Sequence, residues 1–564
     1  MQNLYLRLAP SLVAIIELIL MIAAALLILR SRRAQKQSGS SAFQSFERAF
    51  GHLAQRRGLA VFAVGAGVIA LRVAFTPVLG IPQPRWNDEF SYLLAADTFA
   101  HGKITNPTHP MWVHFESFHI IEHPTYMSMY PPAQGLVLAA GQLLGHPWIG
   151  QLLVTGAMCS VLCWMLQAWL PPQWALFGAI LAALRLGLLS YWMNTYWCAS
   201  VAALGGALVL GAWPRLRRRP SACQSLILAF GLAILANSRP YEGFVFAIPI
   251  AIAMLYWLAG PNHPAFRVTL SRVALPILVV LLVTGLATGY YYYRVTGSPL
   301  RMAHQVNRET YATAPYFIWQ TPRREPVYRY EVIRNLYDWE LAEFEKYRTF
   351  SGYFLGVGWK LKSWWQFYLG PLLTVPLLAV PWVVRQRKML LPLAICAAMA
   401  AGFAVQTWTL PHYFSPAVCV LYLLLVQCMR HLWQWSQANW QLGRKVVRAI
   451  SVVACAMILL RLAAAGTHIL IEPAWPRGNL ERAMILRQLQ QLPESQLVIV
   501  RYGPHHDFDR EWVYNEADID AAKVVWARDV GRSDNQELLD YFRDRKVWLV
   551  EADSPAPQPR PYTD

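Results

Sequence analysis

Charged residues are scarce in this sequence. Of its 564 residues, 15% are charged and 56% are hydrophobic, whereas soluble globular domains carry about 25% charge. The hydrophobic residues gather in runs with little or no charge, and most runs are long enough to cross the ~30 Å hydrocarbon core of a bilayer as a helix. The composition therefore excludes an ordinary soluble domain and predicts a protein that crosses a membrane many times.

Cysteine is sparse as well. The eight cysteines all lie in or beside apolar runs, and the long polar segments hold none. No disulfide framework and no zinc-ligand spacing can be read from such a distribution. The first apolar run, residues 9–29, lacks the basic n-region and the small-residue cleavage site of a signal peptide. We therefore expect this run to be retained as a membrane helix.

The apolar runs predict about twelve membrane helices, with boundaries uncertain by a few residues. They lie near 9–29, 58–80, 147–169, 173–190, 199–213, 222–238, 243–259, 273–293, 367–384, 389–408, 416–430 and 447–466. With this count, every basic cluster falls on one side of the membrane: 30–36, 56–57, 215–219, 267–272, 385–388 and 444–448. Cytoplasmic loops collect Lys and Arg, so this side is expected to be the cytoplasm. The same bias explains the net charge of +18 without a nucleic-acid partner.

The other side of the membrane then receives three large polar segments: loop 81–146, loop 294–366 and tail 467–564. Residues 1–57 provide the first helix and a basic cytoplasmic loop, and residues 58–466 form the membrane domain. In the tail, strand-like runs at 497–501, 524–526 and 547–551 alternate with helical patterns. The expected fold is a mainly α polytopic membrane protein with a small C-terminal α/β extracytoplasmic domain.

An acidic pair, Asp88 and Glu89, stands just beyond the outer end of the second expected helix. A carboxylate in low-dielectric surroundings has a raised pKa and can serve as a general base. Equally, the pair could be the acidic first turn of an exposed helix, which the helix dipole favours. The same loop carries Glu116, His119, Tyr126 and Tyr130, and the last of these leads through Pro131 and Pro132 into a short apolar helix.

The acidic pair, the Pro-Pro motif, the large outer loops and the topology together resemble the GT-C superfamily of membrane glycosyltransferases. Residues of about 58–430 carry this resemblance. It is closest to the bacterial members related to protein O-mannosyltransferases and to the aminoarabinose transferase of lipid A, families 39 and 83. Two departures are visible. The helix at 9–29 is extra, and Tyr130 stands where the aminoarabinose enzymes have Lys.

The resemblance implies transfer of a sugar from a polyprenyl-phosphate donor to a lipid, glycan or protein acceptor, at the outer face of a bacterial inner membrane. Direct displacement at the anomeric carbon would invert its configuration. Asp88 would be the general base. Glu89 or Glu116 would position the acceptor or bind a divalent cation, although no cofactor is required by the sequence.

Several arginines lie in the outer third of expected helices, where the positive-inside rule does not ask for them: Arg72, Arg185, Arg239, Arg294 and Arg461. Charges inside a bilayer are costly and usually functional, and a guanidinium fork suits a phosphate. Snorkelling toward headgroups is the alternative explanation. We expect the substrate site to include Glu116, His119, Tyr126, Tyr130, Arg239, Tyr241, Glu242, Arg294, His412 and Tyr413. For His412 and Tyr413 an interfacial aromatic belt explains the pattern equally well.

Two other classes of function remain open. A lipid or polysaccharide transporter or flippase would show internal repeats, broken helices and ionisable residues near the midplane, whereas no clear repeat is visible here. A scaffold protein whose tail binds a partner is the third possibility. In the tail, His505, His506, Asp507 and Asp509 look like metal ligands, but zinc needs a defined third or fourth ligand, and we predict no metal site there.

Overall fold

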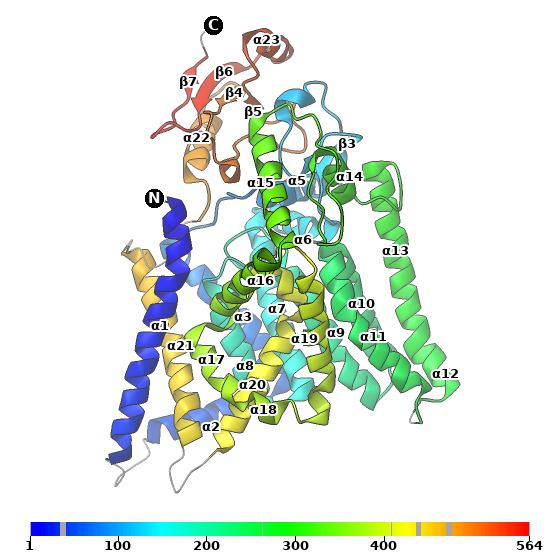
Figure 1. Cartoon of the computed structure of the whole chain (residues 1–564), viewed down its shortest axis with the longest axis vertical. Helices are drawn as coiled ribbons and strands as arrows, with labels where there is room; N and C mark the ends of the chain where they lie inside the picture. The colour runs from blue at the N-terminus through cyan, green and yellow to red at the C-terminus, as the bar shows by residue number, and fades with distance from the viewer. Residues whose placement is uncertain are drawn as a thin grey trace.

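The structure is a computed structural model that describes residues 2–33, 41–261, 263–407, 409–435, 442–467, 469 and 477–562. The end of the basic cluster at 30–36 therefore lies outside the described residues. Upright helices form a bundle, and the outer loops and the C-terminal sheet stand above one end of it (Figure 1). Helices α1 and α21 border the bundle on one side and α13 on the other.

The bundle consists of apolar helices. Nine helical stretches of the described residues are long and apolar enough to cross a membrane, and three shorter apolar helices accompany them. Each overlaps one of the twelve ranges expected from the sequence, while the number of true crossings stays a prediction. The helices are α1 (Gln2–Arg33), α3 (Arg57–Ala74), α7 (Pro147–Trp169), α8 (Pro172–Ala182), α9 (Ala199–Arg218), α10 (Ala222–Ser238), α11 (Pro240–Ala259), α13 (Leu275–Thr296), α16 (Phe350–Trp364), α17 (Gly370–Thr374), α18 (Val380–Val383), α19 (Leu390–Ala404), α20 (Val418–Gln434) and α21 (Leu442–Gly466).

The stretch Phe350–Val383 differs most from expectation. Its apolar helix begins at Phe350, whereas the polar outer loop was expected to run to residue 366. The start of this helix could not be recognised from hydropathy because Lys360 interrupts the apolar run. In the structure Lys360 is buried, and its Nζ donates to the carbonyl oxygen of Phe403 at 3.2 Å. The stretch is also broken: the π-helical turn η4 (Trp365–Leu369) separates α16 from α17, and Gly370 has a φ of 60°.

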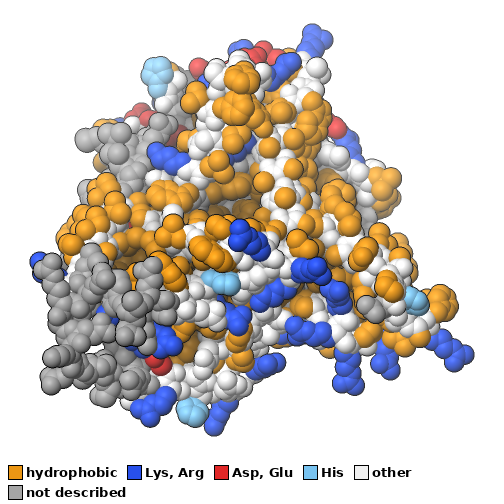
Figure 2. Space-filling view, turned by 60° about the horizontal axis from the view of Figure 1, so that its bottom comes forward, with side chains coloured by type: hydrophobic (Ala, Val, Ile, Leu, Met, Phe, Trp, Pro, Cys, Tyr) orange, Lys and Arg blue, Asp and Glu red, His pale blue; other side chains and the backbone are white. Residues whose placement is uncertain are grey.

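Basic side chains gather at the end of the bundle opposite the outer loops. Exposed arginines and lysines lie at the end of α9, between α11 and α13, and after α18: Arg217, Arg218, Arg219, Arg267, Arg272, Arg385, Arg387 and Lys388. Figure 2 shows Lys and Arg side chains around this end. The amphipathic helix α2 (Ser41–Gln55) also lies there (Figure 1). The charge asymmetry matches the positive-inside pattern, and the assignment of this end to the cytoplasm stays a prediction.

The C-terminal residues form a small α/β unit. Strand β4 (Gln496–Arg501) lies between β5 (Val524–Arg528) and β6 (Lys546–Glu551), all three parallel, and β7 (Arg560–Pro561) pairs antiparallel with β6. Helices α22 (Leu480–Gln490) and α23 (Arg532–Tyr541) connect to this sheet. The three parallel strands coincide with the runs expected from the sequence.

The C-terminal unit shares its hydrophobic core with the first outer loop. The short helix α4 (Thr76–Leu79) precedes that loop. The loop contains α5 (Asn87–Ala100), α6 (Pro132–Leu143) and a small antiparallel sheet of β1 (Asn106–Pro107), β3 (Thr125–Ser128) and β2 (Ile120–Ile121). Phe90 and Leu94 of α5 pack in one cluster with Leu497, Tyr514 and Leu538 of the tail. The rings of Phe90 and Tyr514 stack with centroids 4.1 Å apart.

Buried charges join the second outer loop to the same assembly. Its helices are α14 (Ala303–Tyr311) and α15 (Glu331–Arg348), and they are linked by an ion pair of 2.6 Å between Arg308 and Glu340. Arg528 of the tail pairs with Glu511 at 2.6 Å and stacks on Tyr330 of this loop. The three outer segments therefore form one cap over the bundle.

Candidate active site

Glu89 fixes the start of α5. It is 1% exposed, and its carboxylate accepts hydrogen bonds from the backbone amides of Arg85 at 3.0 Å, Trp86 at 3.1 Å and Tyr196 at 3.1 Å. Burial raises the pKa of Glu89. The hydrogen bonds from the three amides lower the pKa, but burial outweighs them and the pKa is about 7. Both oxygens are engaged, so Glu89 ties the first turn of α5 to the turn between α8 and α9 and orients the residue beside it.

That neighbour, Asp88, is half-buried, with 26% of its side chain exposed. Its Oδ1 accepts a hydrogen bond from His119 Nδ1 at 2.9 Å and another from the Tyr130 hydroxyl. Among the described residues no hydrogen bond involves its second oxygen, Oδ2. Burial raises the pKa of Asp88, but the charge and hydrogen bond of His119 and the hydrogen bond of Tyr130 outweigh it and lower the pKa to about 2. Asp88 is therefore ionised at neutral pH and keeps one oxygen open.

His119 is held in a strained backbone conformation. Its φ of 59° is left-handed, and within the described part of the chain it is the one residue other than glycine with a positive φ. The carbonyl oxygen of His119 accepts from Ser91 Oγ at 2.6 Å and from the Met129 amide at 3.1 Å, which holds this conformation. Such strain costs about 1–3 kcal/mol and tends to persist where function requires it.

Arg239 lies in the turn between α10 and α11. Its guanidinium carbon is 4.2 Å from the centroid of the Tyr413 ring, and its buried Nε has no hydrogen-bond partner among the described residues. Tyr413 lies close enough to both Arg239 and Asp88 to feel both charges. A guanidinium donor without a partner, within electrostatic reach of the same tyrosine as an ionised carboxylate, can bind an anion near a base.

His412 and Tyr92 complete this group. His412 is 3% exposed, its ring packs 4.4 Å from Trp197, and its Nδ1 is 3.4 Å from the Tyr191 hydroxyl. Tyr92 stacks on Tyr130 at 4.4 Å and donates to Cys198 Sγ at 3.3 Å. The structure thus brings together six of the expected residues, namely Asp88, Glu89, His119, Tyr130, Arg239 and Tyr413, and places His412 beside them.

Other expected site residues have different partners. Glu116 accepts from the Tyr311 hydroxyl at 2.8 Å and pairs with Arg329 at 3.3 Å. Tyr126 is buried in the core shared with the tail and donates to the carbonyl oxygen of Asn515. These two residues stabilise the cap.

Three further candidates lie on α11 and α13. Tyr241 donates to the Gly402 carbonyl oxygen at 2.9 Å, which turns it toward α19. Arg294 is exposed on α13 and donates to the Tyr290 hydroxyl. Glu242 is buried and lies within electrostatic reach of Arg239, so it belongs to the site only through that arginine.

The row of outer arginines does not form one anion site. Arg72 is fully buried and donates to Asn194 Oδ1 at 3.0 Å, Thr76 Oγ1 at 3.2 Å and the Gly80 carbonyl oxygen at 2.8 Å. Arg185 pairs with Glu17 at 3.2 Å. In both arginines all three guanidinium nitrogens have protein partners. Arg461 lines a cavity with Glu17 and Arg185. Of this row, Arg239 is the arginine that acts on Tyr413 together with Asp88.

Three residues lie within electrostatic reach of the site although we did not expect them there: His304 and Tyr316 of the second outer loop and Asp509 of the tail. His304 hydrogen-bonds and stacks with Tyr316, at a ring distance of 5.1 Å. Burial and the charges of Arg308, His119 and Arg239 lower the pKa of His304 to about 3. Burial and the neighbouring Asp507 raise the pKa of Asp509 to about 6, and Asp88 contributes in the same direction. More than 200 residues of sequence separate these side chains from Asp88, so no local motif could have revealed them.

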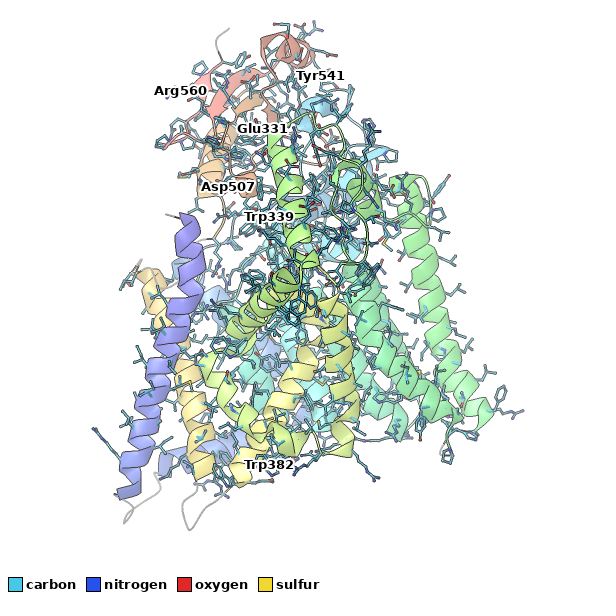
Figure 3. The ribbon with its side chains drawn as sticks, viewed as in Figure 1. Glu331, Trp339, Trp382, Asp507, Tyr541 and Arg560 are labelled. Atoms are coloured by element: carbon cyan, nitrogen blue, oxygen red, sulfur yellow. The ribbon has the colours of Figure 1, made fainter. Side chains whose placement is uncertain are left out.

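The tail segment with His505 and Asp509 does not gather into a metal cluster. His506 pairs with Asp553 at 2.8 Å, and Asp507 accepts the Asp509 amide at 3.1 Å. Figure 3 labels Asp507 where the C-terminal unit meets the rest of the cap, with Trp339 on α15 nearby. Among the described residues no group of three His, Cys, Asp or Glu side chains is arranged to hold a metal ion.

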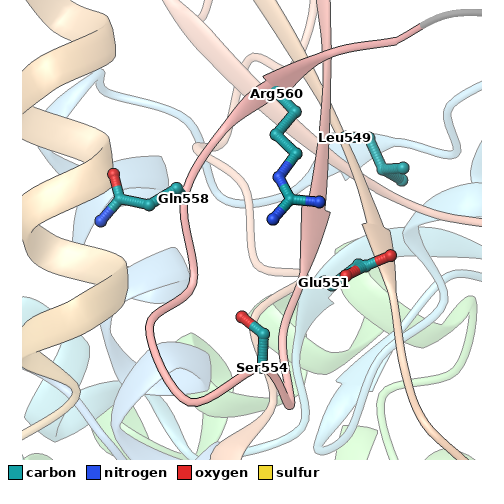
Figure 4. A pocket seen from close by; sticks show the side chains of 5 residues that line it. All are labelled: Leu549, Glu551, Ser554, Gln558 and Arg560. Carbon is teal, nitrogen blue, oxygen red and sulfur yellow. The ribbon is translucent and has the colours of Figure 1, made fainter.

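A hollow on the C-terminal sheet is too small for a substrate. Leu549, Glu551, Ser554, Gln558 and Arg560 line it (Figure 4), and its volume is about 10 Å³. One water molecule needs about 10–15 Å³. The group around Asp88 and Arg239 is the candidate active site because it combines an ionised carboxylate with a buried guanidinium whose Nε has no partner among the described residues.

Comparison with known proteins finds no matching family model and no matching curated protein. Among solved structures, the chain is similar to the oligosaccharyltransferase of the archaeon Archaeoglobus fulgidus. The form tethered to an acceptor peptide with an NVT sequon is 11% identical, with 87% of this chain and 69% of that chain covered and a TM-score of 0.48. The apo form is 12% identical, with 88% and 69% covered and a TM-score of 0.45. At these values the function has to be argued from the residues of the site.

Proposed function

We propose that this chain is a membrane glycosyltransferase of the GT-C type that acts at the outer face of a bacterial inner membrane. It would move a sugar from a polyprenyl-phosphate donor to a hydroxyl of a lipid, glycan or protein acceptor, with inversion at the anomeric carbon. The observation that carries the proposal is that one site holds an ionised, half-buried Asp88 and an arginine, Arg239, whose buried Nε has no hydrogen-bond partner among the described residues.

Asp88 is the proposed general base. Its open Oδ2 accepts the proton of the acceptor hydroxyl while the hydroxyl oxygen attacks the anomeric carbon and the bond to the phosphate oxygen breaks. A base must have a pKa closer to the working pH than about 2. An acceptor that takes over the place of the Tyr130 hydroxyl, and excludes water, would remove a stabilising hydrogen bond and raise the pKa of Asp88.

Arg239 is the proposed partner of the departing lipid phosphate. The Arg239 guanidinium stacks on the Tyr413 ring, which fixes the plane of the guanidinium, and Nε still has a hydrogen bond to donate. A donor held in place before the reaction stabilises the charge that develops on the leaving group. Inversion requires the base and the leaving group on opposite faces of the sugar. Asp88, in the first turn of α5, and Arg239, in the turn between α10 and α11, would have to approach the sugar from these two faces.

The carboxylates that the GT-C resemblance offers to a divalent cation do not fit that role. Both oxygens of Glu89 accept backbone amides, and Glu116 is engaged by Tyr311 and Arg329. No step of the proposed reaction depends on a cation.

Sugar transfer by the purified protein tests the proposal. The protein in lipid nanodiscs is given a panel of polyprenyl-phosphate sugars and candidate acceptors, and Asp88→Asn should abolish the transfer that the wild type shows. Asp518→Asn is the matched control, because Asp518 is 58% exposed and pairs with Lys103 on the surface. Full activity in Asp88→Asn would remove Asp88 from the mechanism. Movement of lipid-linked sugar across proteoliposomes without transfer would favour the flippase alternative.

A further inference from the structure

Helix α1, the extra helix relative to the GT-C resemblance, carries a carboxylate inside the bundle. Glu17 is 2% exposed, whereas Ile15, Leu18 and Ile19 around it are 52%, 46% and 58% exposed on the outer side of the same helix. The helix packs against α21, α17 and η4. A charge at this depth is costly and is usually retained for a purpose.

Arg185 is the ion-pair partner of Glu17, and it also binds a second segment. It lies in the π-helical turn η2 (Ala183–Leu188), which follows α8. Its Nη1 lies 3.2 Å from Glu17 Oε1, while its Nε and Nη2 donate to the carbonyl oxygens of Phe367 at 2.9 Å and Gln366 at 2.7 Å. Those carbonyls belong to the π-helical turn η4, where the helix is broken. Irregular backbone at membrane depth requires such protein donors, so one guanidinium neutralises Glu17 and satisfies the broken turn.

Gly370 shows how closely α1 approaches this turn. Its φ of 60° is left-handed, and a Cβ placed on it would lie 2.2 Å from Glu17 Oε2 and 2.9 Å from Arg185 Nη2. A side chain at position 370 would displace the ion pair. A small cavity of about 30 Å³ adjoins the pair and is lined by Glu17, Arg185 and Arg461, which is room for a water molecule.

The π-helical turn η4 also supports the candidate active site. The Phe367 ring packs 4.9 Å from Tyr191, and the Tyr368 hydroxyl donates to the Pro411 carbonyl oxygen at 2.6 Å. Tyr191 lies 3.4 Å from His412, and Pro411 precedes it. The contacts therefore run without interruption from Glu17 through Arg185 and η4 to the residues that surround His412.

We infer that α1 contributes to the candidate active site. Glu17 is a positioning residue: through Arg185 it holds η4 and the turn Pro411–Ala417, which contains His412, in place. The kinetic side of this inference rests on the proposed function. The structural side does not, because the ion pair and the broken turn exist whatever the site does.

Hydrogen exchange of the full-length protein in nanodiscs tests the structural side. Glu17→Leu should accelerate amide exchange in 364–374 and 409–417 by about tenfold, since local opening follows the loss of a buried partner. Glu17→Gln keeps an acceptor for Arg185 and should stay close to wild type. Met21→Ala is the matched control, because Met21 lies one turn from Glu17 on α1, packs against the same core and carries no charge. It should leave both segments unchanged.

A double variant separates positioning from simple charge burial. Glu17→Leu with Arg185→Leu removes both charges but also the donors to Gln366 and Phe367, so exchange should stay fast. Recovery of slow exchange in the double variant would overturn the inference, as would equal acceleration by Met21→Ala or none by Glu17→Leu. In the transfer assay Glu17→Leu should lower kcat more than it raises KM for the donor. An unchanged kcat would overturn the kinetic side alone, and absence of transfer by the wild type would refute the proposed function without touching the exchange result.

Discussion

Replacing His119 by Asn should raise the pKa of Asp88 and shift the pH dependence of the protein. The pKa of Asp88 is about 2 and its ordinary value is 3.8, with the charge of His119 as the largest lowering influence. This difference of nearly two units corresponds to about 2 kcal/mol. Burial raises the pKa of Asp88, and in His119→Asn the charge of His119 no longer opposes this effect. The pKa of Asp88 in this variant should therefore return to 3.8 or above. Asn is chosen because it tolerates the left-handed backbone of His119.

Two measurements check this prediction. In the transfer assay, the acid limb of the kcat/KM profile should move up by about two pH units. Stability should change as well. A carboxyl whose pKa is lower in the folded state contributes stability above its unfolded pKa of 3.8, and this contribution is lost as the pH falls toward 2. Wild type should therefore lose about 2 kcal/mol more than His119→Asn over this range, measured by thermal unfolding at a series of pH values.

His101→Asn is the control, because that side chain is 62% exposed and pairs with Asp97 on the same loop. It should follow the wild type at every pH. If His119→Asn also follows the wild type in both the acid limb and the unfolding series, then His119 does not set the ionisation of Asp88, and the proposed base has to be reconsidered.

Three further predictions address the arginine, the helix start and the cap. Arg239→Met keeps an apolar stem on Tyr413 but removes the phosphate donor, so kcat should fall about 100-fold; an unchanged kcat in the transfer assay would contradict this role. Glu89→Ala leaves three backbone amides without an acceptor and should cost about 3 kcal/mol or more, seen as a lower Tm, and an unaltered Tm would show that water replaces the carboxylate. Arg528→Met leaves Glu511, which is 0% exposed, without its partner and should cost about 3–5 kcal/mol. In the control Arg501→Met, the lost arginine is 51% exposed, and Asp529 keeps its hydrogen bonds from Gly531 and Asn535. This variant should cost about 0–1 kcal/mol, so similar Tm losses in the two variants would argue against a special role for the buried pair.

The parts of the fold that depend on local pattern could be predicted from the sequence. An apolar run fixes a membrane helix without reference to the rest of the chain, and the strands β4, β5 and β6 follow from β-branched and aromatic runs. Asp88 and Tyr130 could be singled out in the same way, because an acidic pair and a Pro-Pro motif are short and contiguous.

The roles of the arginines could not be predicted, because their partners are distant in sequence. Arg72 and Asn194 are separated by 122 positions and Arg185 and Glu17 by 168, so hydropathy places these arginines at the membrane edge without showing that each is already saturated. His304 appears in the sequence as one basic residue in a polar loop. The fold alone brings it within electrostatic reach of Asp88.

The core that the first outer loop shares with the tail has a consequence for biogenesis. Residues 81–146 leave the ribosome early, but Phe90 and Leu94 of α5 find their packing partners Leu497, Tyr514 and Leu538 only when the last part of the chain has been made. Every membrane helix is made before that moment. We expect the helix that carries Asp88 to settle last, so that a chain lacking its C-terminal residues would insert into the membrane yet remain inactive, with an unfinished apolar surface for quality-control proteases to recognise.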